Sequence, residues 1–249
     1  PKITEEDLKK VEVKEVKKEE VKVEKKTEEV KVEKKEEQQG KEVNLDEKSW
    51  EKLNIFFCNF SESAVPYFEK DKLSDDELIK FGIRHNLINM PKNIQKVNEN
   101  ENYTEKVSAE NVHNAIKKYF GKDFTNDKTV VAFNEDNMKA DFMFKDNFYF
   151  IPKELPVQID PIRNPTGETM KVAQVENMYQ NSETEFTVNL SIYSIYPDAY
   201  SESIENKKIY KLKSEFWGKE APEVFAKAKA KIKKTENEKY ILIEYTEDK

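Results

Sequence analysis

Residues 11–37 are the feature that most limits how much of this chain can fold. The stretch contains nine Lys, ten Glu, seven Val and one Thr, so its charges nearly cancel. It has no aromatic and no large aliphatic residue, and such a segment cannot bury enough apolar surface to offset the entropy lost on ordering. Residues 1–44 are therefore predicted to be a disordered, extended tether, which leaves about 205 residues for a folded part.

A second interpretation of the same stretch remains open. Glu–Lys pairs four residues apart each stabilise a helix by a few tenths of a kcal/mol. The motif VKVEKK also occurs twice, at 21–26 and 30–35. The alternative to a tether is therefore a single long charged helix.

Composition argues against several functional classes. The net charge of the chain is −7, and residues 1–44 contribute only −1 of it, with 13 Lys against 14 acidic residues. A folded part of charge −6 argues against nucleic-acid binding, which depends on Lys and Arg neutralising phosphates. The chain has five Gly and neither a P-loop nor a GxGxxG motif, so a phosphate-cradling loop is not expected. No cofactor and no metal ion is predicted.

Helical periodicity dominates from 46 to about 122. Asp46 or Ser49 is expected to cap a first helix that is apolar almost all round, and Ser74 a second one. Ser108 is predicted to cap a third helix that Gly121 ends. The apolar stripe of this third helix consists of Val112, Ala115, Ile116, Tyr119 and Phe120. NENENYTEK, between the second and third helices, is expected to be a polar loop.

Strand patterns follow residue 128. ADFMFKDNFYFIP predicts a hairpin that turns at Asp146-Asn147, and two long alternating segments, 169–179 and 185–197, predict further strands. APEVFAKAKAKIKK is ambiguous, but its alanines and Pro222 favour a helix. KYILIEY is expected to be the last strand. The fold class predicted is α+β, with N-terminal helices packed on a mainly antiparallel, curved β-sheet.

We expect one α+β domain over 45–249 after the tether at 1–44. Four prolines in 152–168 mark an irregular connection. A division into 45–151, with the helices and the hairpin, and 169–249, with the later sheet, is the alternative.

Cys58, His85 and His113 are the only Cys and His residues of the chain. A cysteine hydrolase would need an exposed thiolate, whereas Cys58 lies within the most apolar helix, where a thiol behaves as a small hydrophobic group. Two histidines without a third ligand make a weak metal site. We therefore predict no catalytic residue.

Four polar side chains stand out in the apolar segment FGIRHNLINMPKNI. They are candidates for lining a ligand-binding groove, although Asn near a helix end is more often a cap. These candidate ligand-binding residues are Arg84, His85, Asn86 and Asn89.

The segments LNIFFCNFSE, DDELIKFGIRHNLIN and NVHNAIKKYFG resemble, in order and spacing, a domain found in envelope lipoproteins and secreted proteins of low-GC Gram-positive bacteria. The resemblance covers about 50–160. That family has no established activity, so the resemblance implies a location and a fold. The charged tether likewise resembles the spacer between a lipid-modified cysteine and the first domain of a bacterial lipoprotein.

The function expected is therefore a non-enzymatic surface lipoprotein that acts as a monomeric binding module outside the cytoplasmic membrane. Its anchor would be an N-terminal lipid that this chain has lost, and its ligand a protein, a wall polymer or a small molecule. Two alternatives remain: an envelope enzyme, such as a wall hydrolase using Cys58 with His85 or His113, and a cytosolic interaction protein.

FAKAKAKIKK, with five lysines in eight residues, is interpreted as a solvated face or as a contact for an anionic polymer or membrane.

Overall fold

The structure is a computed structural model that describes residues 40–97, 102–135, 138–153, 155 and 169–248. The described residues belong to one compact unit. Residues 1–39 of the tether predicted over 1–44, and most of the proline-rich connection, 156–168, lie outside the described residues.

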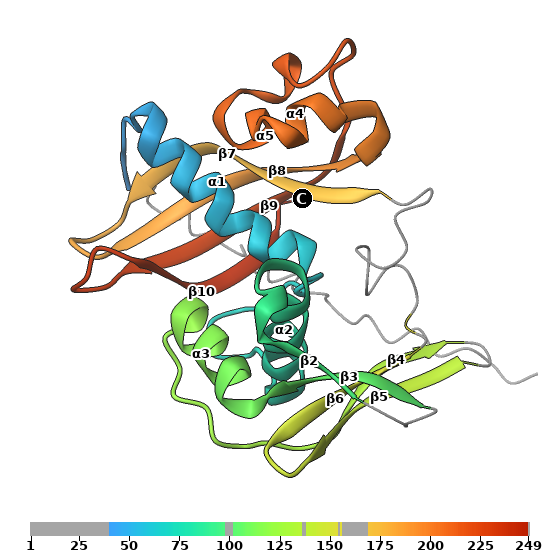
Figure 1. Ribbon diagram of the computed structural model, residues 1–249. Helices are drawn as coiled ribbons and strands as arrows, with labels where there is room; N and C mark the ends of the chain where they lie inside the picture. Colours follow the sequence, from blue (N-terminus) through green and yellow to red (C-terminus); the bar gives the residue numbers. More distant parts are fainter. Residues whose placement is uncertain (1–39, 98–101, 136–137, 154, 156–168, 249) are drawn as a thin grey trace, which may run out of the picture. The chain divides into compact units, whose positions relative to one another are not determined.

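The described strands form two five-stranded sheets, and every pairing between them is antiparallel (Figure 1). The first sheet has the order β1 (Lys41–Glu42), β7 (Met170–Gln180), β8 (Glu185–Ile195), β9 (Val224–Lys234) and β10 (Tyr240–Glu247). The second has the order β2 (Ile94–Lys96), β3 (Tyr103–Ser108), β6 (Phe148–Pro152), β5 (Met138–Lys145) and β4 (Val130–Glu135). The α+β class is confirmed, with two sheets in place of the single sheet expected.

Three long helices begin at the caps that the sequence predicts. Side chains of Asp46, Ser74 and Ser108 accept hydrogen bonds from backbone N–H groups three residues on. The helices are α1 (Glu47–Glu62), α2 (Asp75–Asn89) and α3 (Ala109–Phe120). Gly121 ends α3 with a left-handed φ of 67°, as a helix-ending glycine should.

Aromatic rings from the three helices form the centre of the core. Phe60 of α1 lies 5.6 Å from Phe81 of α2 and 5.6 Å from Phe120 of α3, measured between ring centroids. Tyr119 of α3 contacts both Phe60 and Phe81. The predicted apolar stripe of α3 is buried throughout. These contacts explain why the apolar periodicity of residues 46–122 predicts the helices correctly.

One edge of β7 is covered by side chains of α1. β1 pairs only with the last residues of β7, Tyr179 and Gln180. Further along this edge, Trp50 Nε1 donates to the Val175 carbonyl at 2.8 Å, and Asn54 Oδ1 accepts from the Val175 N–H at 2.8 Å. A side chain therefore satisfies each backbone group of Val175, as a neighbouring strand otherwise would.

The same contact continues toward the end of α1. Cys58 Sγ donates to the Ala173 carbonyl at 3.4 Å, and Ser61 Oγ donates to the Lys171 carbonyl at 3.0 Å. The polar residues within the apolar NIFFCNF segment are thus explained in part by the unpaired edge of a strand more than a hundred residues later in the chain.

The hairpin at Asp146-Asn147 is confirmed, with φ of 52° and 62° at the two turn residues, which a tight hairpin turn requires. The helix favoured for 221–234 is wrong, because residues 224–234 form β9. Ala228, Ala230 and Ile232 have no exposed surface, while the intervening lysines point to the other face. Burial of alternate side chains overrides the helix propensity of alanine in this segment.

Two boundaries also differ from the sequence interpretation. Part of the expected polar loop NENENYTEK belongs to β3, which pairs with β2 and β6. Lys41 and Glu42, assigned to the tether, form β1. A Cβ at Gly40 would lie 2.2 Å from the Gln180 carbonyl oxygen, so only glycine permits this approach of the two backbones. The first sheet therefore begins before residue 45.

Candidate functional site

A pocket lies in the segment that joins β8 to β9. This segment consists of short helical turns at Pro197–Tyr200, Ser201–Glu205 (α4), Lys208–Lys211 (α5) and Ser214–Phe216. Gln174 of β7 holds it to the sheet, since its Nε2 donates to the Leu212 carbonyl at 2.8 Å and its Oε1 accepts from the Ser214 N–H at 3.1 Å. Both the Nε2 and the Oε1 of the buried Gln174 side chain therefore fix the segment to β7.

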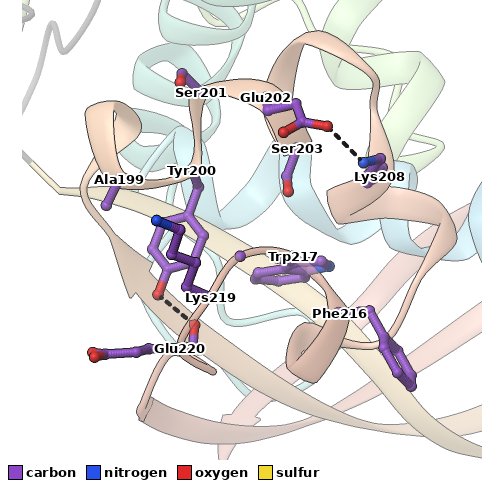
Figure 2. Close-up of a pocket in the computed structure, with 11 residues that line it drawn as sticks. Ala199, Tyr200, Ser201, Glu202, Ser203, Lys208, Phe216, Trp217, Lys219 and Glu220 are labelled. Carbon is purple, nitrogen blue, oxygen red and sulfur yellow. Dashed lines mark hydrogen bonds and ion pairs between the residues drawn. The ribbon is translucent and has the colours of Figure 1, made fainter.

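Trp217 forms the floor of this pocket. The residue is 3% exposed, and its ring contacts Tyr193 of β8 edge to face at 5.3 Å and donates from Nε1 to the Leu212 carbonyl. Figure 2 shows the indole in the middle of the lining residues, with the Tyr200 ring beside it and the Phe216 ring directed away at the rim. The volume is about 730 Å³, within the range of small-molecule sites.

The rest of the lining is polar with balanced charge. Lys208 forms an ion pair with Glu202 at 3.1 Å, and Tyr200 OH donates to the Glu220 carbonyl at 3.4 Å (Figure 2). Ser201, Ser203, Lys219 and the Glu220 carboxylate add hydroxyl, cationic and anionic groups. The two acidic and two basic side chains of the lining cancel, so the pocket suits an uncharged or zwitterionic ligand.

Gly218 permits the close packing of this site. A Cβ at this position would lie 3.1 Å from Cε1 of Tyr200, tighter than ordinary van der Waals contact. The sequence Phe216-Trp217-Gly218 is the signal that could have revealed the pocket. Sequence reasoning missed it because no periodicity marks the segment.

A second pocket, of about 520 Å³, lies beside α3. His113 Nε2 is 2.9 Å from Asp127 Oδ1, and Tyr149 OH donates to the same oxygen at 2.6 Å. Because the buried Tyr149 hydroxyl holds Asp127, the carboxylate orients the imidazole of His113. This arrangement ties the loop after α3 to the helix. Burial of Tyr149 and its hydrogen bond to Asp127 both raise the pKa of its hydroxyl.

The four predicted ligand-binding residues line neither pocket. Arg84 is buried and donates from Nη1 to the Ser63 carbonyl at 3.0 Å, while its Nε has no hydrogen-bond partner among the described residues. Asn86 is 1% exposed and bonds to the Gly82 and Asn111 carbonyls and to Asn93. Asn86 thus joins α2 to α3, a structural role that an apolar segment gives no means of distinguishing from binding.

His85 and Asn89 pack together at the end of α2. Asn89 Nδ2 is 3.4 Å from His85 Nδ1, and the His85 ring lies against Phe81 and Tyr119. Burial, with a smaller effect from Lys118, lowers the pKa of His85 to about 4. The imidazole is therefore neutral at physiological pH.

Cys58 and Glu62 occupy the last two turns of α1. The Cys58 thiol is 2% exposed, and burial raises its pKa well above the ordinary value. Burial also raises the pKa of Glu62 to about 7, although hydrogen bonds with Asn89 and Tyr210 oppose this rise. The buried Cys58 thiol is a poor nucleophile, because attack requires an accessible thiolate.

No family model, curated protein or solved structure matches this chain. The resemblance to an envelope lipoprotein domain therefore stays a prediction. Within the described residues, no three His, Cys, Asp or Glu side chains form a group able to hold a metal ion. None of the described helices has the length and apolarity needed to span a membrane.

Proposed function

We propose that this protein is a binding module that takes an uncharged, hydroxyl-rich ligand such as a saccharide in the Trp217 pocket. The observation that carries the proposal is the half-buried Tyr200 ring beside the buried Trp217 indole, together with hydroxyl groups and balanced charges in one lining. Saccharides present apolar C–H faces, which pack on aromatic rings, and hydroxyls, which pair with polar side chains. The module acts by binding rather than by catalysis.

The test is a titration with soluble N-acetylhexosamine oligomers followed by NMR. The chain has two tryptophans, Trp50 on α1 and Trp217 in the pocket, so their indole N–H signals report two separate places. We expect the Trp217 signal to shift on titration while the Trp50 signal stays unchanged. A shift confined to Trp50, or no shift, would contradict the proposed site.

Two matched substitutions locate the site further. Tyr200→Leu removes a ring from the lining, and Tyr196→Leu makes the same change at a 58% exposed tyrosine outside it. We expect Tyr200→Leu to raise the dissociation constant about tenfold or more, as for a central contact residue. Tyr196→Leu should leave it within about twofold. Equal losses in both variants would place the ligand elsewhere, provided that both keep the parent unfolding temperature.

The proposed location is the outer face of the cytoplasmic membrane, where the Lys/Glu-rich segment serves as a spacer for a lipid anchor. Its support is the composition of residues 1–44, which suits a solvated tether that sets a high local concentration of the module. Mass spectrometry of the N-terminus of the protein isolated from its own host tests this. A diacylglycerol-modified cysteine upstream of the chain supports the anchor, and an unmodified cytosolic form refutes it.

The alternative of a hydrolase using Cys58 has its own test, iodoacetamide labelling. The thiol is buried and donates its hydrogen bond to Ala173, so we expect labelling only in denaturant. A Glu183→Cys, Cys58→Ser variant provides an exposed thiol as the control. Labelling of native Cys58 at the rate of this control would restore the enzyme hypothesis.

A further inference from the structure

A row of lysines occupies one face of β9. Lys227, Lys229, Lys231 and Lys233 alternate with the buried Ala228, Ala230 and Ile232. Alternate residues of a strand are about 6.7 Å apart on one face, so the four lysine side chains leave the strand along a line about 20 Å long. This line, called the lysine row below, lies on a domain that is otherwise acidic.

Three amines of the lysine row have no acidic partner among the described residues. Lys231 forms an ion pair with Glu244 of β10 at 3.1 Å, whereas Lys227, Lys229 and Lys233 have none. Glu185 is opposite Lys233 in the β8–β9 register but forms no ion pair with it. Three of the four positive charges of the row therefore have no ion-pair partner among the described residues.

Besides Glu185 and Glu244, the row has polar, uncharged neighbours. Ser191, Asn189 and Thr187 of β8 stand in register with Lys227, Lys229 and Lys231, and Asn189 donates to Asn177 of β7. Ser191 is buried, whereas Thr187 and Asn189 are half-buried. A hydroxyl and an amide group beside ammonium groups can bind both the phosphates and the hydroxyls of one ligand. The set lies on the same face of the sheet as Gln174 and Tyr193, which hold the pocket segment.

Repulsion within the row indicates the sign and form of a ligand. Two amines held at the backbone repeat of about 6.7 Å would repel each other by roughly 0.6 kcal/mol in water. A linear polyanion whose charges repeat at a similar interval replaces this repulsion with attraction at each amine and releases its own counterions. A compact anion would meet only one or two of the amines.

We propose that the lysine row binds a linear phosphodiester polymer with hydroxyl-bearing units, laid along β9. This site is independent of the Trp217 pocket, so either can fail without the other. Membrane headgroups carry the same phosphodiester chemistry. Comparing a soluble oligomer with lipid vesicles as probes distinguishes the polymer from these headgroups.

The test uses the full chain, a glycerol-phosphate oligomer and vesicles of phosphatidylglycerol. Three phosphate contacts predict that log K falls with log salt with a slope of about −2. The row variant combines Lys227→Gln, Lys229→Gln and Lys233→Gln. Its affinity for the oligomer should fall at least tenfold, and its salt slope should approach zero. The control is Lys70→Gln, Lys145→Gln, Lys153→Gln, which removes three exposed lysines from other parts of the fold.

Oligomer binding that is lost in the row variant and kept in the control supports the proposal. An equal loss in both variants would mean non-specific attraction and overturn it. Absence of oligomer binding by the parent overturns it too, as does binding to vesicles alone, which would assign the row to lipid headgroups. The row variant keeps the buried alanines, so its unfolding temperature should match that of the parent.

Discussion

At the scale of single residues, Glu62 combines partial burial with the end of a helix. Its pKa of about 7 in the folded protein is above its ordinary value of 4.5. The folded state therefore holds this proton more tightly than the unfolded state between pH 4.5 and 7. Since stability falls with pH wherever the folded state binds more protons, Glu62 costs nothing below about pH 4.5 and costs most above pH 7.

Glu62→Gln should remove this cost. Above pH 7 we expect the variant to be more stable than the parent by about 1–3 kcal/mol, and below pH 4.5 to match it. Urea unfolding at a series of pH values measures the difference. Glu215→Gln, at an exposed position, should follow the parent throughout. A Glu62→Gln stability that parallels the parent at all pH values would contradict the raised pKa.

Sequence reasoning succeeded with residues whose role is local. Asp46, Ser74, Ser108 and Gly121 act within their own helix ends, so a few neighbouring letters predict them. Asn86 acts across helices, through contacts that the sequence does not encode locally. Arg84, His85 and Asn86 of the predicted binding cluster are buried in these interhelical contacts, whereas Asn89 is exposed.

At the scale of elements, Asn54 of α1 connects this helix to two other elements, β7 and α5. It accepts from the Val175 N–H of β7 and donates to the Tyr210 carbonyl of α5. Asn54→Ala should lower the free energy of unfolding by about 3 kcal/mol, since it leaves both backbone groups without partners. The control is Ile55→Ala on the same helix. Ile55 is 42% exposed, so this substitution should lower the free energy of unfolding by less than about 1 kcal/mol. Chemical denaturation of both variants decides the matter; similar costs would show that the edge contact contributes little.

β9 shows where propensity fails at this scale. Alanine and lysine both favour helices, and their strict alternation is the only signal for a strand. Two neighbouring strands, β8 and β10, supply the backbone partners that decide the outcome. The pocket segment after β8 was missed for the opposite reason, because its turns are too short to show a period.

At the scale of the whole molecule, the start of the folded unit can be tested by truncation. A chain beginning at Gln38 keeps β1, and its free energy of unfolding should stay within about 0.5 kcal/mol of the parent. A chain beginning at Leu45 loses β1 and the Val43 N–H bond to the Met178 carbonyl, and should be less stable by about 1–2 kcal/mol. Thermal unfolding compares the two. Equal stability would return the boundary to residue 45.

The cover of β7 also has a consequence for how the chain is made. Val175 follows Trp50 by 125 residues, so α1 leaves the ribosome long before the strand whose edge it covers. An uncovered strand edge is a template on which another chain can pair. Because the helix is already synthesised when β7 emerges, the nascent strand finds its cover within its own chain. The order of the elements along the sequence thus protects the newly made protein from association with its neighbours.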